Sequence, residues 1–417
     1  MNHPPPLRPP FISTALLVLG ALLAPAAFAQ PAISLQAALE LAYSANPELA
    51  AARQQVGAAQ GARQQAGLLP NPELSLQAED TRSDSRTSAV LLSQRLELGG
   101  KRGARINVAD YGVQAARLEL EQRGNQLRAE VVQAFFAAAR AQVALDLAQQ
   151  SRVLAEHGLK VAQGRIKAGK VSPIDATRAE VQVAETRLQV QRALTSRANA
   201  YRQLEQATAS PLGVGAQVAP QALSPGAAPP TATLLGAIDQ VSELRLAQVQ
   251  TLQAEAALGS EKAQRIPDLT VSLGSQYSRE DRERINLIGV SMPIPLFDRN
   301  QGNVLSAARR ADQAQDLLAA ARWRVRTQAQ SALAQWDTAS AETRAFEQTI
   351  LPGAAQAVAS ATRGFEMGKF AFLDVLDAQR TLIGARSQYL DALATASDAR
   401  VAVERIYGDL SRFTESP

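Results

Sequence analysis

The first hundred residues change from a helical to an extended pattern of apolar positions. Residues 46–67 have the apolar spacing of a helix. Further on, apolar and polar side chains alternate strictly, as at Leu74, Leu76 and Ala78, and a polar segment separates this run from a second extended run. Side chains on a strand point alternately to its two faces. The pattern therefore predicts a β-hairpin over residues 73–98 with one apolar face.

The second half of the chain contains a similar pattern. Leu269, Val271 and Leu273 alternate with polar residues, and a charged turn leads into another extended run. This predicts two strands over residues 268–295. Strands of about ten residues with one apolar face have the length that a membrane barrel requires, but a small soluble sheet would show the same alternation. The strand pattern alone leaves both interpretations open.

A helical period follows each hairpin. After the first one, apolar residues recur at intervals of three and four, which forms a heptad seam with alanine at many contact positions. We expect a long helical hairpin over residues 104–206 that turns at Gly169, since glycine suits a tight turn. The second half predicts the same arrangement over residues 303–411, with a break in its first arm at Pro352 and Gly353.

The two halves also match in sequence. Residues 72–76 correspond to residues 267–271, which lie 195 positions further on, and Gly169 corresponds to Gly368, which lies 199 positions further on. Because such matches occur in the same order at nearly constant spacing, we infer an internal duplication. The expected division is a signal peptide at 1–29, a first repeat at 30–206, a connector rich in proline, glycine and alanine at 207–231, a second repeat at 232–411 and a tail at 412–417.

Residues 1–29 have the features of a secretory signal peptide. Arg8 precedes an uncharged apolar run, and small residues precede a predicted cleavage site between Ala29 and Gln30. A membrane anchor is the alternative, but the apolar run is short and Pro25 interrupts it. No later stretch approaches the ~20 apolar residues of a spanning helix. We therefore expect an exported chain that enters a membrane only as strands or through an interfacial helix.

Composition favours long helices over compact globular domains. The chain is 46% apolar but only 4% aromatic, and about a fifth of its residues are alanine. Small residues let helices pack closely, whereas a large core usually depends on aromatic and larger aliphatic side chains.

Several kinds of chemistry are disfavoured. The chain has no cysteine, which excludes disulfide bonds, thiolate catalysis, Cys-ligated metal sites and lipid attachment through an N-terminal cysteine. A formal charge of +4 without a basic block does not indicate nucleic acid as a partner. The sequence shows no phosphate-binding loop, nucleophile elbow or cluster of metal ligands, so we expect neither an enzyme nor a cofactor.

The predicted elements fit a tube. Four strands cannot close a barrel, and lipid does not tolerate open strand edges, so the chain must share a barrel with copies of itself. Helical hairpins attached to the same ends of the strands would continue this barrel as a helical cylinder about 100 Å long. Such a tube conducts a solute and needs no chemistry of its own.

Four segments carry a resemblance to a known family. They are Leu96-Glu97-Leu98-Gly99-Gly100-Lys101-Arg102, Met292 to Gly302, Gly368 to Gln379, and the first-half echo of the last at Gly169 to Glu180. These segments resemble the TolC-like outer-membrane efflux channels. The first two are similar to the CzcC-type branch, which serves heavy-metal (cobalt–zinc–cadmium) efflux. The resemblance covers nearly the whole chain after the signal peptide.

This resemblance implies both an architecture and partners. The expected fold is mainly α with a small transmembrane β part: a homotrimer whose 12-stranded β-barrel, four strands per chain, continues as a long periplasmic α-helical barrel. The channel would lie in outer-membrane lipid. It would act as the exit duct for cations of the Co, Zn, Cd and Ni class, together with a periplasmic membrane-fusion adaptor and an inner-membrane proton antiporter of the resistance–nodulation–division class.

The resemblance also assigns residues to the periplasmic end. Asp374 and Asp377 lie three positions apart, so they share one helical face, and the family implies that they line the narrow entrance. A simpler interpretation is that Asp374 complements the helix dipole. The family's gate uses a tyrosine and an arginine just upstream, where this chain has Phe365 and Phe370, so the same polar lock cannot form.

The turns of the two helical hairpins are the expected docking tips for the adaptor. They contain Gly169 and Lys170 in the first half and Gly368 and Lys369 in the second. Glycine explains the turn without any docking role, so docking follows from the resemblance alone.

Two alternatives stay open. The same duct could serve drug or organic efflux or type I secretion, because the pump selects the cargo. A soluble periplasmic coiled-coil adaptor or scaffold is less favoured, since an adaptor would have one helical hairpin and this chain has two, each preceded by strands.

Overall fold

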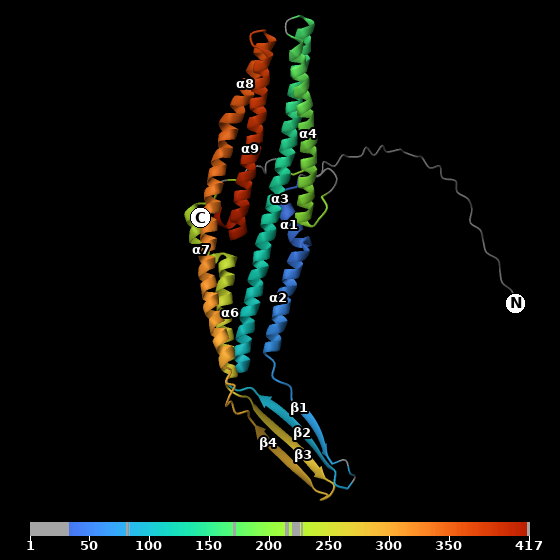
Figure 1. Cartoon of the computed structure of the whole chain (residues 1–417), viewed down its shortest axis with the longest axis vertical. Helices are drawn as coiled ribbons and strands as arrows, with labels where there is room; N and C mark the ends of the chain where they lie inside the picture. The colour runs from blue at the N-terminus through green and yellow to red at the C-terminus, as the bar shows by residue number, and fades with distance from the viewer. Residues whose placement is uncertain are drawn as a thin grey trace, which may run out of the picture.

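The computed structural model describes residues 33–80, 82, 84–169, 172–212, 217–218, 226 and 228–414. The predicted signal peptide, with Ala29 and Gln30, and the predicted tip residue Lys170 lie outside the described residues. The chain forms a long rod with a small sheet at one end and the turns of two helical hairpins at the other (Figure 1).

Four antiparallel strands form one sheet in the order β1-β2-β3-β4. They are β1 (Glu73–Glu79), β2 (Thr87–Leu96), β3 (Leu269–Ser278) and β4 (Arg284–Ser291). Strands β2 and β3 join the two halves of the chain. The outer edges of β1 and β4 pair with no other strand among the described residues.

The register places apolar side chains of all four strands on one face. Leu76 lies opposite Val90, Leu92 opposite Leu273, and Leu273 opposite Ile288. These side chains are exposed, with 72% of Leu76 and 79% of Ile288 accessible. On the other face the hydroxyls of Ser93 and Ser272 lie 3.0 Å apart. The sheet therefore has one apolar face and one mainly polar face, which also carries Leu91, Ile285 and Leu287, and this division suits a barrel wall between lipid and water.

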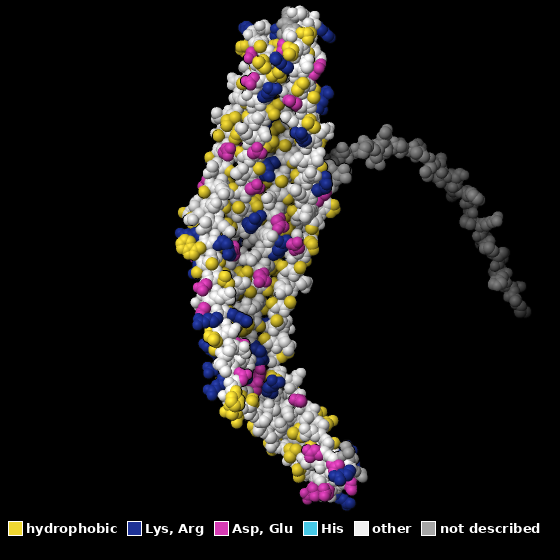
Figure 2. Space-filling model, in the orientation of Figure 1, with side chains coloured by type: hydrophobic (Ala, Val, Ile, Leu, Met, Phe, Trp, Pro, Cys, Tyr) yellow, Lys and Arg dark blue, Asp and Glu magenta, His cyan; other side chains and the backbone are white. Residues whose placement is uncertain are grey.

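Charged side chains gather at the far end of the sheet. In Figure 2 they cluster on the loops there, while the middle of the visible sheet face carries apolar and uncharged side chains. These loops contain Asp80, Arg82 and Asp84 in the first hairpin and residues 279–283 in the second.

The helices follow the same order in each half. The first half has α1 (Leu35–Ala45), α2 (Pro47–Ala66), α3 (Lys101–Lys167) and α4 (Pro173–Thr208). The second half has α5 (Thr231–Gly236), the 3-10 turn η2 (Ile238–Gln240), α6 (Ser242–Gln264), α7 (Gln301–Ala345), the π-helical turn η3 (Phe346–Ile350), α8 (Leu351–Glu366), α9 (Phe372–Tyr407) and α10 (Ser411–Thr414). The two returning helices, α4 and α9, both contain 36 residues, which fits an internal duplication.

Local sequence explains where the helices begin. Asn46 accepts the Leu49 N–H through its side chain at 2.9 Å, and Pro47 occupies the first position of α2. Helix α3 begins after Gly100 and α7 after Asn300, both with positive φ, at 74° and 58°. Glycine and asparagine adopt this left-handed conformation more readily than other residues do.

The predicted break at Pro352 and Gly353 is wrong. The chain remains helical from α7 through η3 into α8, and Pro352 lies in the first turn of α8. The π-helical turn directly before the proline provides the physical reason. There the Leu351 N–H donates to the Phe346 carbonyl, five residues back, so the wider turn accommodates a residue that cannot donate a regular helical bond.

The helices form a wall one helix thick. In the half near the hairpin turns, α9 lies between α7–α8 and α3, and α4 covers the other side of α3 (Figure 1). In the half near the sheet, α6 lies between α7 and α3, and α2 covers the other side of α3. Alanine occupies many buried positions in these contacts, among them Ala38, Ala129, Ala138, Ala329 and Ala396. The predicted close packing of helices through small residues thus replaces a single large core.

The prediction that no stretch after the signal peptide approaches the ~20 apolar residues of a spanning helix was too strict. Among the described helices, α3 contains an 18-residue stretch that would suit a membrane span by length and composition alone. Half of that stretch is buried within the chain, in contact with neighbouring helices. Alanines at packing positions account for its apolar character, so α3 is a helix of the wall.

Candidate channel entrance and sheet junction

The turn between α8 and α9 forms one tip of the rod. Gly368 has φ of 80°, and its N–H donates to the Phe365 carbonyl at 2.9 Å. The Lys369 N–H donates to the Gly364 carbonyl at 2.8 Å. These bonds close the end of α8 in the way that a left-handed glycine allows. In the first half Gly169 likewise has φ of 67°, so both predicted turns depend on glycine.

The two aspartates lie at the start of α9 and are exposed in the single chain. Asp374 accepts the Ala371 N–H at 2.9 Å, which satisfies a free donor at the helix start. This hydrogen bond supports the simpler interpretation, in which Asp374 stabilises the start of α9. Asp377 lies one turn further along and is exposed too, so its lining of an entrance stays a prediction.

Phe365 and Phe370 do not form one site. Phe365 is buried and packs against Phe372, with ring centroids 5.2 Å apart. Phe370 is half-exposed and lies directly on Gly364, where an added Cβ would meet its ring at 2.1 Å. Only a glycine at that position lets the Phe370 ring fold back on α8.

Arg165 connects the two tips, and its role was not predicted from the sequence. It lies near the end of α3, and its guanidinium stacks 4.4 Å from the centroid of the Phe365 ring. It also donates to the Phe365 carbonyl. The contact joins segments 200 residues apart, so no local pattern could have revealed it.

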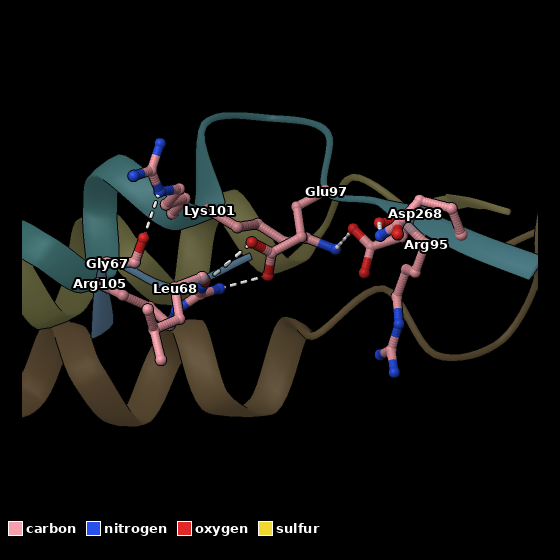
Figure 3. Close-up of polar contacts among 9 residues, drawn as sticks. Gly67, Leu68, Arg95, Glu97, Lys101, Arg105 and Asp268 are labelled. Carbon is pink, nitrogen blue, oxygen red and sulfur yellow. Dashed lines mark hydrogen bonds and ion pairs between the residues drawn. The ribbon is translucent and has the colours of Figure 1, made fainter. Parts of the chain in front are cut away.

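The second polar site lies where the sheet meets the helices (Figure 3). Lys101 is 5% exposed, and its Nζ lies 2.6 Å from Asp268 Oδ1. Arg102 Nε donates to the Gly67 carbonyl at 2.7 Å. Arg105 pairs with Glu97, and hydrogen bonding to this carboxylate raises the pKa of Arg105 above its usual value despite partial burial. These contacts fix the first turn of α3 against the strands of both repeats.

The two segments that carried the branch resemblance meet at this junction. Lys101 belongs to the first of them, and Pro293 and Pro295 of the second follow the last residue of β4, Ser291. Proline cannot donate within a sheet, so it marks the exit of the chain from the strands. Together with Asp268 these residues line an open hollow beside the sheet.

Comparisons with known proteins agree with this architecture. A sequence profile described as "Outer membrane efflux protein" matches residues 38–210 and 236–409. The cobalt-zinc-cadmium resistance protein CzcC of Cupriavidus metallidurans is 39% identical over 378 residues, which is 90% of this chain and 90% of that protein. The nickel-cobalt-cadmium resistance protein NccC of Alcaligenes xylosoxydans xylosoxydans is 28% identical over 78% of this chain and 75% of its own length.

Solved structures show the same fold. CusC, described as forming a transmembrane channel, has a TM-score of 0.77 at 18% identity and covers 90% of this chain and 92% of its own. The outer membrane protein VceC from Vibrio cholerae has a TM-score of 0.72 at 18% identity, covering 90% and 97%. The mainly helical fold with a small antiparallel sheet is confirmed, as are the resemblance and the location in the outer membrane. The chain belongs to the outer membrane efflux protein family and is an efflux channel of the outer membrane.

Proposed function

We propose that this channel is the exit duct of a three-part system that exports heavy-metal cations of the cobalt, zinc, cadmium and nickel class. The observation that carries this proposal is the 39% identity to a cobalt-zinc-cadmium resistance protein across 90% of both chains. The duct is passive and catalyses no reaction. Its partners are a periplasmic adaptor and an inner-membrane proton antiporter of the resistance–nodulation–division class.

The duct is a homotrimer. A four-stranded sheet with free edges on β1 and β4 cannot stand alone in lipid, because its edge N–H and C=O groups would lack partners. Three copies supply twelve strands, and the four-helix width of the wall supplies a matching ring of helices. The adaptor docks at the tips, which contain Gly169, Lys170, Gly368 and Lys369.

Asp377 is better suited than Asp374 to a test of entrance lining, because Asp374 already caps α9 and its substitution would also disturb the start of that helix. In a trimer, three copies of Asp377 form a ring of carboxylates that attracts divalent cations. We expect Asp377→Asn to weaken block of the purified channel by periplasmic-side Co²⁺ in planar bilayers about tenfold. Asp316→Asn, an exposed site on α7, is the control. Equal block of the Asp377→Asn and wild-type channels would rule out entrance lining by this residue.

The cargo can be tested in the native host. Deleting the gene should lower tolerance to Co²⁺, Zn²⁺, Cd²⁺ or Ni²⁺, while tolerance to dyes and antibiotics stays unchanged, and the wild-type gene on a plasmid should restore it. A loss of tolerance to dyes or antibiotics alone would assign the duct to organic cargo. Unchanged metal tolerance in a strain without a substitute duct would contradict the metal assignment.

A further inference from the structure

A groove on the helical wall lies between the two returning helices of the chain. Helices α4 and α9 both pack along α3, one on each side of it (Figure 1). The groove between them is open, has a volume of about 800 Å³ and is lined by residues of all three helices. Its floor consists of alanines of α3 and Arg140, and its two walls come from α4 and α9.

The two walls of this groove come from equivalent positions of the two repeats but differ in chemistry. Three residues of the α4 wall correspond to three residues of the α9 wall, which lie 199 positions further on. They are Gln191, Arg192 and Thr195, which correspond to Leu390, Asp391 and Ala394. The α4 wall is therefore polar with a positive charge, whereas the α9 wall has two apolar residues and one carboxylate.

Arg140 brings a buried donor to the floor of the groove. Its Nη1 atom is buried and has no hydrogen-bond partner among the described residues. Burial lowers the pKa of Arg140, and the charge of Asp398 acts in the opposite direction. Arginine nevertheless stays protonated in proteins, so the floor carries a positive charge. Because buried donors normally have an acceptor, this nitrogen indicates an acceptor that the chain itself does not supply.

Helix packing does not explain this arginine. The equivalent residue of the second repeat, 199 positions further on, is Ala339 of α7. Ala339 is 2% exposed, so a methyl group is enough to fill that position in the second long helix. The charge of Arg140 is therefore not a requirement of the duplicated wall, and it calls for a separate role.

The α4 wall supplies further donors next to this floor. Arg192 is exposed in the groove. The Asn199 Oδ1 atom accepts a hydrogen bond from Arg202 at 2.9 Å, which leaves the amide N–H groups of Asn199 available. Two arginines against Asp391 on the opposite wall leave the groove with an excess of positive charge. A guanidinium presents parallel N–H donors, which match the oxygens of a carboxylate or a phosphate.

The groove lies on the same side of the wall as the polar face of the sheet. Ser93 of that face lines the hollow beside the sheet, together with Glu261 of α6. Glu261 also lines a second hollow, between α2 and α6, to which α3 contributes Gly112. Gly112 and Arg140 lie four heptads apart, so both occupy one face of α3. With the apolar face of the sheet in lipid, this side of the wall is the lumen.

We propose that the groove is a luminal binding site for a small oxyanion, with Arg140 donating from the floor and Arg192 and Asn199 donating from the α4 wall. All of these groups belong to one chain, so a trimer holds three such sites. The bound anion offsets the positive charge that would otherwise repel passing divalent cations, and this part of the inference rests on the proposed function.

Binding of inorganic phosphate to the purified channel, at constant ionic strength, tests the site. We expect saturable binding of one phosphate per chain. Arg140→Met should weaken this binding about tenfold, because a charged donor is lost. Arg192→Met, at an exposed position that tolerates substitution, should weaken it about threefold. Arg178→Met, which removes an arginine paired with Asp175 within α4, is the control and should bind like the wild type.

Competition identifies the class of anion. Sulfate should displace the phosphate, whereas chloride, which cannot accept two parallel hydrogen bonds as an oxyanion does, should compete far more weakly. Equal competition by chloride would overturn the assignment to an oxyanion. The site itself is overturned if the wild type shows no saturable phosphate binding, or if Arg140→Met and Arg192→Met both bind as the wild type does.

Ion permeability tests the position of the groove in the lumen. In planar bilayers with a KCl gradient, Arg140→Met should lower the ratio of chloride to potassium permeability about twofold, since a fixed positive charge is lost from the channel wall. An unchanged ratio would overturn the luminal position. Both measurements are made without metal cargo. Failure of the metal-tolerance test would thus leave the site standing, whereas absent phosphate binding with intact metal tolerance would overturn the site alone.

Discussion

Valine in place of Gly274 is expected to prevent the channel from assembling in the outer membrane. Gly274 lies in β3 opposite Leu91 of β2. A Cβ at this position would lie 2.5 Å from the Val90 carbonyl oxygen and 3.2 Å from the Leu91 Cα. Because these are backbone atoms, the strands themselves would have to separate, at a cost beyond about 3 kcal/mol. The β2–β3 pair joins the two repeats in the sheet, so its loss opens the barrel.

The readout is the amount of heat-modifiable oligomer in outer-membrane fractions. Gly289→Val is the control, because a Cβ at Gly289 in β4 would have Ser272 Cβ as its nearest neighbour, at an ordinary 3.7 Å. This variant should assemble normally. Normal assembly of Gly274→Val as well would show that β2 and β3 are less closely paired at Gly274 than the 2.5 Å distance to the Val90 carbonyl oxygen implies.

Replacement of Lys101 by methionine is expected to destabilise the folded channel by about 3 kcal/mol. The Lys101 ammonium is almost fully buried and lies 2.6 Å from Asp268. Methionine keeps the length of the side chain but removes its charge, which leaves the Asp268 carboxylate partly buried without this partner. Removing one member of a buried ion pair typically costs 3–5 kcal/mol, and the partial exposure of Asp268 places the cost at the low end.

The measurement is the denaturant midpoint of the purified protein in detergent. A Lys101→Met/Asp268→Asn variant should recover part of the loss, since it no longer contains the unpaired charge. Arg102→Met, which removes a hydrogen bond from an exposed neighbour, should cost under about 1 kcal/mol. A Lys101→Met midpoint equal to that of the wild type would contradict a stabilising role for the pair.

The sequence predicted those parts of the fold that depend on neighbouring residues. The alternation at Leu74 and Leu76 and the glycines at 169 and 368 are local signals, because strand faces and left-handed turns are set within a few residues. The predicted helix break at Pro352 was wrong because it also relied on a local signal. The effect of a proline on a helix is usually local, but here the preceding π-helical turn accommodates it.

Contacts between distant segments could not be predicted from local sequence patterns. Arg165 reaches Phe365, and Lys101 reaches Asp268, only because the repeats lie side by side. Periodicity records which face of a helix is apolar, but it does not record which residue of another helix lies opposite. The turn at Gly368 was predicted from local sequence, whereas the different surroundings of Phe365 and Phe370 depend on tertiary packing.

The pairing of β2 with β3 also determines the order in which the chain can fold. Each helical hairpin joins segments that are adjacent in sequence, whereas the sheet joins residues such as Ser93 and Ser272, which are 179 positions apart. Closing so long a loop is the slow kind of step in folding. Until the second repeat supplies β3, the first hairpin exposes an apolar face and an unpaired β2 edge. Until its second half arrives, the nascent channel therefore carries an apolar face and a strand edge that favour aggregation, and this exposure follows from the topology of the sheet.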